Sequence, residues 1–571
     1  MTQLTLNGKT VQAAPRETLL EVIRREGIHV PTLCHWEGLP AVGACRLCVV
    51  EVEGQANLVP ACATPVVEGM AVRTHSPRVV DARRTILELI LANHPDDCLF
   101  CSRKNSCELL KLAAEMGISG RTWHGAKIHH PKDVSSPAIS RDPAKCILCG
   151  RCVRVCSQIQ AVGAIDFTSR GATTLVAPAF GEGLNASSCV HCGQCVRACP
   201  TGALTDASHI PRVLAALSDP SLITVVQHAP SVSVTLGEYF GFEPGADVEG
   251  LLVSALRKLG FSHVFDTSFT ADLTVMEEAS ELVERIRNNG PLPMFTSCSP
   301  AWVRYVETFY PRFVPHLSTC KSPQQMMGSI IKNVWARREG IVPRRVFSVA
   351  IMPCTAKKAE ARRPEMLSEG VFDVDAVLTT RELADLITMQ GIDFRQLHPQ
   401  TADHPFGTRS SSGKLFGVTG GVLEAAARTA VHALTGVNPD VDAFVQLHEN
   451  AGIREMTVQA GGMQLHVVAV SGLAAARRVL EEIESGRMQA HIVEVMSCPG
   501  GCIAGGGQPY GTDERAVAAR AQALYRIDGG TTLRFSHENP DILRLYEEEL
   551  GKPLSEKSHQ LLHVHREVHH G

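Results

Sequence analysis

The sequence lacks several features that would assign it to common classes of protein. It contains no apolar run approaching the roughly 18 residues of a membrane-spanning helix. Its formal net charge is only -4, which gives no electrostatic reason to expect a nucleic-acid partner. The start, MTQLTLNGKT, has neither the basic and apolar blocks of a secretory signal nor a twin arginine. We therefore expect a cytoplasmic protein that does not span a membrane.

What the sequence does have is cysteine. With 44% hydrophobic and 20% charged residues the composition is globular, and 571 residues suggest roughly four domains. The 20 cysteines do not indicate a disulfide scaffold, because such proteins are small and secreted. Fifteen of the cysteines lie in the first 200 residues, in groups of short spacing. This distribution predicts a front half dense in metal ligands, attached to a large and mostly apolar body.

Local patterns predict an α+β multidomain organisation. LTLNGKTVQ reads as a hairpin turning at Asn7-Gly8, LLEVIRREG as a helix ending at Gly27, and CVVEVEG as a strand. DARRTILELILANH is an amphipathic helix. We expect a small ferredoxin-like domain of the β-grasp type at 1–78, a second cysteine unit at 79–120, a polar linker at 121–140, a repeated cysteine unit at 141–208 and the body at 209–571.

The body alternates short apolar runs with helical stretches. This alternation predicts an α/β fold with a largely parallel sheet, whose ligands lie beyond the carboxyl ends of the strands. The predicted strands are LITVVQ, SHVFDT, LPMFTSC, VFSVAIMPC, DAVLTT and HIVEVMSC, several of which run directly into a cysteine.

Two complete CxxCxxCxxxC runs occupy the repeated unit. Zinc needs four ligands per ion and does not call for this duplication, whereas ferredoxins with two [4Fe-4S] clusters do. In such proteins the fourth cysteine of each run crosses to the other cluster. Pro200 follows the second run, while Ser157 replaces that proline after the first. The expected ligand sets are Cys146, Cys149, Cys152 and Cys199 for one cluster, and Cys189, Cys192, Cys195 and Cys156 for the other.

Two further cysteine groups precede this unit. The spacing of Cys34, Cys45, Cys48 and Cys62 indicates a [2Fe-2S] cluster, with zinc as the alternative. The group Cys98, Cys101 and Cys107 lacks a fourth cysteine, and we expect His94 to complete a third accessory [4Fe-4S] site. The alternative is that His94 is an ordinary solvated histidine.

Three segments of the body share a family likeness. They are TSCSPAW at 296–302, MPCTAKKAE at 352–360 and EVMSCPGGCIAGGGQP at 494–509. Together they resemble the signature segments of [FeFe]-hydrogenases (iron-only hydrogenases) of the large, multi-cluster type. The long gap between Cys34 and Cys45 also occurs in hydrogenases and in a respiratory complex I subunit. With the four front clusters included, the resemblance covers essentially the whole chain.

The resemblance implies reversible H2 oxidation and proton reduction at a six-iron H-cluster. That cofactor is a [4Fe-4S] cubane joined to a two-iron unit that carries CO, cyanide and azadithiolate. Cys354, Cys498 and Cys502 match ligand positions, with Cys502 as the bridge to the two-iron unit, and Lys357 matches the partner of a cyanide. A phosphate-binding loop is the alternative for the glycine run, but no GK[ST] follows it. The residues that match the lining of the two-iron pocket are Pro230, Ser231, Gln324, Met352, Phe416 and Met496.

The resemblance also implies a proton relay of Cys298, Glu278, Ser318 and Glu281. Glu278 and Glu281 are three residues apart in MEEASELVER and would share a helix face. The alternative is a solvated helix on which Glu281 only pairs with Arg285. Glu277 and Glu284 are expected to be solvated in this way.

One position departs from the family pattern. The family has two adjacent cysteines in the first segment, one relaying protons and one ligating the cubane, but here Ser299 follows Cys298. Ser299 could ligate iron through oxygen, Cys298 could turn inward as a ligand, or the unpaired Cys320 could take part. We expect Ser299 on or near the cubane and Cys298 in the relay, with Cys320 a buried free thiol.

Other classes of function make different demands on the sequence. A pure electron-transfer subunit would not need the segments at 352–360 and 494–509, and an iron-sulfur assembly protein would lack the full front half. An H2-sensing or weakened hydrogenase-like subunit is the alternative that Ser299 leaves open. The tail SHQLLHVH at 558–565 resembles catalytic subunits of NAD(P)-linked, NADP-reducing hydrogenases.

The chain has no flavin or dinucleotide fingerprint. The expected partners are therefore flavin- and NAD(P)-binding hydrogenase subunits, or ferredoxin as in single-chain clostridial-type enzymes. Maturation proteins are also expected, because the two-iron unit does not assemble from iron and sulfide alone.

Overall fold

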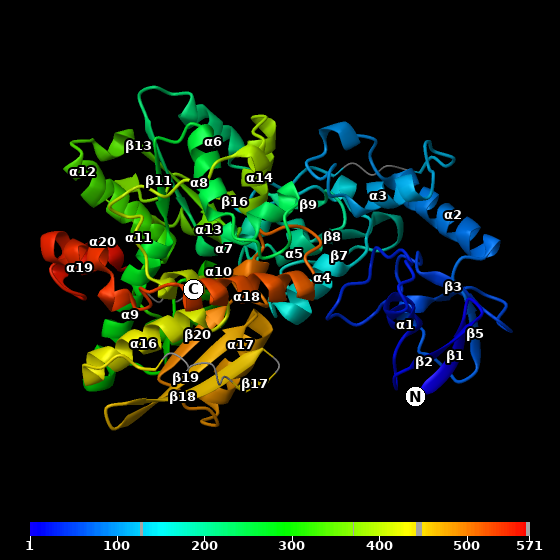
Figure 1. Cartoon of the computed structure of the whole chain (residues 1–571). Coiled ribbons are helices and arrows are strands. Elements are labelled where there is room, and N and C mark those ends of the chain that lie inside the picture. Colours follow the sequence, from blue (N-terminus) through cyan, green and yellow to red (C-terminus); the bar gives the residue numbers. More distant parts are fainter. Residues whose placement is uncertain (126–129, 369, 441–447, 451, 567–571) are drawn as a thin grey trace.

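A computed structural model describes residues 1–125, 130–368, 370–440, 448–450 and 452–566. The N-terminal units lie on one side of the molecule, the C-terminal body on the other, and the repeated cysteine unit lies between them (Figure 1). Within the described residues, no helix has the length and apolar character needed to cross a bilayer.

The N-terminal unit is built around a five-stranded sheet in the order β2-β1-β5-β3-β4. The hairpin, the helix and the strand predicted here are confirmed. Asn7 and Gly8 form the turn with positive φ angles of 50° and 85°. Thr18 caps the helix and forms a reciprocal capping box with Glu21. The elements are β1 (Thr2–Leu6), β2 (Lys9–Ala13), α1 (Leu19–Arg25), β3 (Val49–Val52), β4 (Val59–Pro60) and β5 (Met70–Arg73).

Two helices frame the second cysteine unit. Helix α2 (Pro77–Asn93) starts earlier than its sequence pattern indicated, because Ser76 caps it and Pro77 occupies its first turn. Helix α3 (Glu108–Glu115) begins directly after Cys107. The cysteine loop therefore lies between two fixed helix ends.

The two cysteine runs fold alike, as their internal repeat predicts. Leu148 and Gly150 in the first run have positive φ angles of 54° and 71°, and His191 and Gly193 in the second have 59° and 72°. A short helix follows each glycine. The elements here are β6 (Ile139–Arg141), α4 (Arg151–Arg154), the π-helical turn Val155–Ile159, β7 (Asp166–Thr168), β8 (Leu175–Ala177), α5 (Gln194–Ala198) and β9 (Leu204–Asp206).

The end of the expected linker is part of this unit. Strand β6 begins at Ile139 and pairs with β9, and Asp133 forms a bridge with Arg141. Ordered structure therefore begins before residue 140, where the polar composition had indicated only a connection.

The body contains two larger sheets rather than one, besides the two-stranded pair β14 (Leu367–Ser368) and β15 (Val371–Phe372). The first is parallel throughout, in the order β11-β10-β13-β16, and the second, β12-β20-β19-β18-β17, is mixed. All six predicted strands are present. The strands of the first sheet are β10 (Ile223–His228), β11 (His263–Asp266), β13 (Val346–Met352) and β16 (Ala376–Thr379). Those of the second are β12 (Met294–Phe295), β17 (His448–Asn450), β18 (Ile453–Ala460), β19 (Met463–Ser471) and β20 (Ile492–Met496).

The sequence patterns did not predict the antiparallel part of the second sheet. Strands β18 and β19 pair closely around Gly461 and Gly462, which both have positive φ. The alternation in this hairpin is typical of a sheet with one covered face. The expectation of a largely parallel body is therefore right for the first sheet and wrong for this part of the second.

Helices pack around the two sheets, and α9 (Ser268–Arg287) is the longest among the described residues. It contacts α11 (Pro323–Ile330) and α16 (Gly421–Thr435). The other helices are α6 (Ile210–Leu217), α7 (Pro230–Ser233), α8 (Glu249–Lys258), α10 (Pro300–Phe309), α12 (Ala336–Arg338), α13 (Ala356–Glu360), α14 (Thr380–Met389), α15 (Ser411–Lys414), α17 (Leu473–Glu484), α18 (Glu514–Gly530), α19 (Pro540–Leu545) and α20 (Glu556–Leu562).

Candidate functional site

The first four cysteines form one buried cluster of thiols. The side chain of Cys34 hydrogen-bonds with those of Cys45 and Cys62, and Cys62 also hydrogen-bonds with Cys48. The backbone N–H of Cys45 donates to Cys34 Sγ over 3.4 Å, and Leu33 N–H donates to Cys45 Sγ over the same distance. Four converging sulfurs with N–H donors around them suit an iron-sulfur cluster of two irons.

His94 lies at the C-terminal end of α2, four residues before Cys98. Its Nδ1 atom is buried and has no hydrogen-bond partner within the described structure. Burial lowers the pKa of His94 to about 4, so the imidazole is neutral and can act as a ligand. A solvated histidine, the alternative we considered, would not be only 8% exposed.

The repeated unit brings its eight cysteines together as two sets. Cys146, Cys149, Cys152 and Cys199 line one cavity. Cys156 lies instead near Cys189, Cys192 and Cys195, close enough for their charges to interact. The fourth cysteine of each run therefore lies with the three close cysteines of the other run.

Side-chain and backbone contacts connect both N-terminal cysteine units with the repeated unit. Arg154 donates to the carbonyl of Cys34 over 2.6 Å. On the other side, Glu108, the neighbour of Cys107, donates its N–H to Pro200 O over 3.0 Å and forms an ion pair with Arg151 over 2.8 Å. The cysteine loops of both N-terminal units thus contact the repeated unit.

A buried cavity lies where the two sheets of the body meet. Cys298 and Cys354 follow β12 and β13, and Cys498 follows β20, so the cavity lies beyond the carboxyl ends of strands from both sheets, as predicted. Cys192 of the repeated unit also lines it. The other predicted residues that line this cavity are Ser299, Cys502, Lys357, Pro230, Ser231, Gln324, Met352, Phe416 and Met496.

The cavity suits a bulky iron-sulfur cofactor. Two side-chain oxygens, Ser231 Oγ and Gln324 Oε1, are buried without a partner among the described residues. Gly501, at a φ of 88°, lies so close to residue 419 that a Cβ atom would stand 2.8 Å from that backbone nitrogen. Burial raises the pKa of Cys354 to about 12, so a metal that bound this sulfur would have to displace its proton.

Lys357 and Lys358 are both buried. Two adjacent lysines in a sequence favour a surface position for at least one of them, and the structure contradicts this. Lys358 is 0% exposed and pairs with Glu382 over 2.7 Å. Lys357 lies at the cavity, where Nζ donates to Cys298 O and to Glu360 Oε2, each over 3.0 Å. Its ammonium group places a positive charge at the wall of the cavity.

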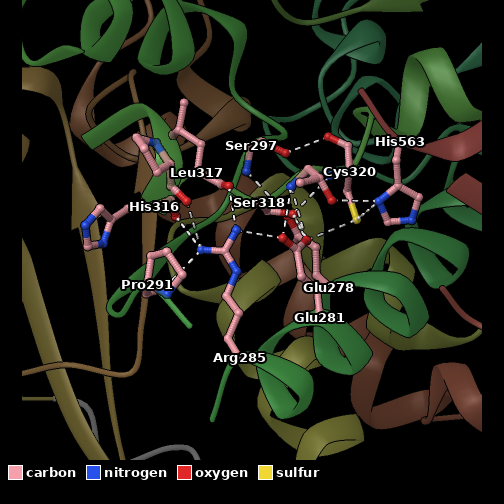
Figure 2. Close-up of polar contacts among 12 residues, drawn as sticks. Glu278, Glu281, Arg285, Pro291, Ser297, His316, Leu317, Ser318, Cys320 and His563 are labelled. Carbon is pink, nitrogen blue, oxygen red and sulfur yellow. Dashed lines mark hydrogen bonds and ion pairs between the residues drawn. The ribbon is translucent and has the colours of Figure 1, made fainter. Parts of the chain in front are cut away.

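The four residues expected to relay protons lie close together, and Figure 2 shows three of them, Glu278, Ser318 and Glu281. Ser318 Oγ donates to Glu281 Oε2 over 2.9 Å and is also within hydrogen-bonding reach of Glu278. Burial, with a contribution from the charge of Glu281, raises the pKa of Glu278 to about 8. Cys298 lies near enough to Glu278 for their charges to interact. Glu281 also pairs with Arg285 over 2.7 Å, but it is 7% exposed, so the alternative of a solvated helix is wrong here. The relay role of Glu281 remains a prediction.

Arg285 closes the outer end of this row. Its guanidinium donates to the carbonyl oxygens of Pro291, His316 and Leu317 over 3.1, 3.2 and 2.8 Å (Figure 2). The side chain is 10% exposed, so the row reaches from the cavity almost to solvent.

The expectation of a solvated Glu277 is wrong, whereas Glu284 is exposed as expected. Glu277 is 0% exposed and accepts hydrogen bonds from Tyr546 OH, Ser558 Oγ and the N–H of Leu554. All these donors come from the last 26 residues of the chain, so no local signal in MEEASELVER could have indicated them.

Ser299 occupies the N-cap position of α10 without using its hydroxyl as a cap. Instead, Ser299 Oγ lies 2.7 Å from Ser497 Oγ, next to Cys498. Sequence reasoning did not find Ser497. Cys320, expected as a buried free thiol, is 0% exposed. The ligand role of Ser299 remains a prediction.

Models of known families match the chain in consecutive segments. A model described as "Iron only hydrogenase large subunit, C-terminal domain" matches residues 222–506, and "Iron hydrogenase small subunit" matches 514–565. In front of these, "2Fe-2S iron-sulfur cluster binding domain" matches 1–77, "NADH-ubiquinone oxidoreductase-G iron-sulfur binding region" matches 83–121, and "4Fe-4S dicluster domain" matches 145–203.

Relatives of known function match over the full length. NADP-reducing hydrogenase subunit HndD of Solidesulfovibrio fructosivorans is 46% identical over 99% of this chain and 98% of its own. Iron hydrogenase 1 of Clostridium pasteurianum is 38% identical, with 99% of each chain covered. Among solved structures, a variant of [FeFe]-hydrogenase HydA1 from Chlamydomonas reinhardtii covers 63% of this chain and 99% of its own, at 38% identity and a TM-score of 0.58.

Proposed function

Since the chain belongs to the iron-only hydrogenase family and is an oxidoreductase that acts on H2, we propose that it binds a six-iron H-cluster through Cys354, Cys498 and Cys502. The observation that carries this proposal is the convergence of these three cysteines on one buried cavity. Around it lie Lys357 and two side-chain oxygens, Ser231 Oγ and Gln324 Oε1, that have no partner among the described residues. When bound, the cofactor would supply the metal site at which H2, two electrons and two protons interconvert.

The protein's part in electron transfer is to hold four accessory clusters that carry electrons to and from the cavity. We propose one [2Fe-2S] cluster on the first four cysteines, one [4Fe-4S] cluster on His94 with Cys98, Cys101 and Cys107, and two on the repeated unit. Cys192 lines the same cavity as Cys498, so the last accessory cluster would lie beside the catalytic one. The contacts of Arg154 and Glu108 support two entry branches that meet at the repeated unit.

The protein's part in proton transfer is the row from Cys298 to Arg285. Glu278, with a pKa near 8, can both take and give a proton at neutral pH. Ser318 connects Glu278 with Glu281 through its hydroxyl, and Arg285 holds the Glu281 carboxylate in place at the outer end. Water is largely excluded along this row, because Glu278 and Ser318 are both 0% exposed.

Infrared spectroscopy of the matured protein tests the cofactor assignment. The expected result is a set of CO and cyanide stretching bands that shift between H2-reduced and oxidised samples. Replacing Cys502 with Ala removes the proposed bridge and should abolish these bands while the accessory clusters remain. Accessory-cluster signals without any CO or cyanide band in the wild-type protein would contradict the proposal and favour a pure electron-transfer subunit.

For the electron partner, we propose flavin- and NAD(P)-binding hydrogenase subunits. The full-length likeness to a protein named as a subunit of an NADP-reducing hydrogenase supports this choice, and the chain itself carries no dinucleotide fingerprint. Co-purification of a flavin-containing subunit that confers H2-dependent NAD(P) reduction is the expected result. An isolated chain that reduces ferredoxin at full rate would favour the single-chain alternative. We also propose that maturation proteins must be co-expressed for activity.

A further inference from the structure

We infer that Glu281, Cys320 and His563 form a binding site for a zinc-like divalent cation, and that occupancy of this site stops the proposed proton relay. The inhibitory part of this inference rests on the proposed function, whereas the binding part does not. One carboxylate oxygen of Glu281, Cys320 Sγ and one ring nitrogen of His563 lie within 4.8 Å of one another. Cys320 and His563 are 243 residues apart in the sequence, so no local sequence motif indicates a metal site here.

The backbone holds the three side chains in place. Glu281 lies on the long helix α9, whereas Cys320 and His563 face each other across an antiparallel bridge. Lys321 N–H donates to Leu562 O over 2.7 Å and Val564 N–H donates to Thr319 O over 2.8 Å, one on each side of this bridge. Cys320 Sγ lies 4.0 Å from both Glu281 Oε2 and His563 Nδ1 (Figure 2). Around a tetrahedral zinc ion the sulfur would lie about 3.6 Å from the other two donors, so these two distances would each shorten by a few tenths of an ångström.

The two ring nitrogens of His563 face different groups. His563 Nε2 lies 3.1 Å from Glu277 Oε2. Glu277 also accepts hydrogen bonds from Tyr546 OH and Ser558 Oγ, so its carboxyl oxygens act as acceptors. With Nε2 turned to Glu277, the Nδ1 atom of His563 is the ring nitrogen that faces Cys320 Sγ. A carboxylate behind a ligating histidine is the usual outer shell of a zinc site.

The donor set favours zinc over harder cations. A thiolate, an imidazole and a carboxylate are ligands typical of Zn2+, whereas Mg2+ and Ca2+ prefer oxygen donors alone. Thr319 Oγ1 now lies 2.8 Å from His563 Nδ1, and a cation would have to displace this hydroxyl. Binding would also release the Cys320 thiol proton to solvent, leaving two anionic ligands that balance the charge of the cation.

The same carboxylate oxygen serves the relay. Ser318 Oγ donates to Glu281 Oε2 over 2.9 Å, and Cys320 Sγ lies 4.0 Å from that oxygen. A cation on Oε2 would compete with the Ser318 hydroxyl and remove the negative charge that receives a proton. The exposed His559, whose ring centroid lies 4.4 Å from that of His563, offers a first contact for a cation arriving from solvent.

Zinc binding to the matured holoenzyme tests the inference directly. After anaerobic incubation with ZnCl2 and gel filtration, the wild-type protein should retain one more zinc per chain than Cys320→Ala and His563→Gln. Zinc K-edge absorption should show one sulfur at about 2.3 Å with nitrogen and oxygen at about 2.0–2.2 Å in the wild type. The sulfur shell should be absent in Cys320→Ala. His466→Gln, which alters an exposed histidine stacked on His491, is the matched control and should bind as the wild type does.

Inhibition is measured separately, as H2 evolution relative to each variant's own rate without zinc. The half-inhibitory zinc concentration should rise more than about 100-fold in Cys320→Ala, since loss of even an outer-shell partner costs about 10–100-fold in affinity. Equal zinc content and equal sulfur shells in wild type and Cys320→Ala would overturn the inference. Zinc bound at this site without inhibition would uphold binding but contradict both the inferred block and the relay through Glu281.

Discussion

Ser299 Oγ lies 2.7 Å from Ser497 Oγ at the wall of the cavity that Cys354, Cys498 and Cys502 share. Ser299 stands where the family pattern places a cubane cysteine, and its hydroxyl is directed to this neighbour instead of to the backbone of α10. A serine that bonds a second serine can be held as an oxygen donor at a metal. Ser299 replaces the family's second cysteine, and the structure shows that its hydroxyl bonds Ser497. The first signature segment alone does not indicate this contact.

Replacing Ser299 with Cys should raise the reduction potential of the cubane. An alkoxide is a harder and more basic donor than a thiolate, so it makes a cluster harder to reduce and its bond sensitive to protons. The pH dependence of turnover assigned to the relay should stay unchanged. The measurement is an EPR-monitored redox titration of the matured protein.

Ser497→Ala is the control for this change, because it removes the hydroxyl pair while leaving Ser299. It should shift the potential less than Ser299→Cys does. If Cys298→Ala lost the cubane signal while Ser299→Ala kept it, Cys298 would be the ligand, and our assignment of the two residues would be reversed.

Glu278→Gln should lower H2 turnover by about 10²–10⁴-fold, the usual contribution of a positioned acid or base. Cluster content should not change, because the amide keeps the shape of the side chain. Glu277→Gln, one residue earlier on α9, is the matched control. It leaves the relay intact, and we expect it to destabilise the protein by about 1–3 kcal/mol through its contacts with Tyr546 and Ser558. Equal losses of turnover in both variants would contradict the relay.

The pH profile of H2 evolution provides a second check on Glu278. Because burial raises its pKa to about 8, the side chain is protonated below that pH and can donate. Evolution should therefore fall as the pH rises through about 8, provided that electrons are supplied in excess. In Glu278→Gln this fall should disappear from the residual rate. An unchanged profile in the variant would place the limiting ionisation elsewhere.

Ligand spacing made the front half of this protein predictable. The short spacing of Cys146, Cys149 and Cys152 predicts that these three residues lie together around one cluster. The structure places Cys199 with them. The strands of the body were equally clear, because short apolar runs ended at cysteines. The family resemblance added the cavity residues, all of which line one site.

The sequence could not predict the burial of polar residues by segments that lie far away along the chain. Glu277 looks like a solvated helix residue until α20 and its neighbours cover it. Lys358 looks like a surface lysine until Glu382 of α14 pairs with it. Cys320 and His563 meet only because the segment after α20 bridges the segment just before α11. Each of these contacts joins segments with no shared local pattern, so only the folded chain shows them.

Gly506→Ala should disturb the contact between the repeated unit and the catalytic cavity. A Cβ atom on Gly506 would clash with the carbonyl oxygen of Cys192 and lie 2.8 Å from Gly193 Cα. We expect a loss of about 1–3 kcal/mol in the free energy of unfolding, together with slower electron transfer to the cavity. Gly529→Ala in α18, where nothing lies within 4 Å of the added Cβ, is the control and should stabilise by about 0.5–1 kcal/mol. Equal stabilities of the two variants would contradict the close contact.

His94→Ala should remove one accessory [4Fe-4S] cluster, and His94→Cys should restore it with a lower potential. Nδ1 of His94 is buried without a partner among the described residues, and its imidazole is neutral, as a ligand must be. A thiolate in its place adds negative charge to the cluster, which makes reduction harder. Iron content and a redox titration measure both effects, and His124→Ala, an exposed histidine of the neighbouring segment, serves as the control. If His94→Ala kept the full iron content and an unshifted titration, the fourth ligand would have to be another residue, and His94 would be only a buried core histidine.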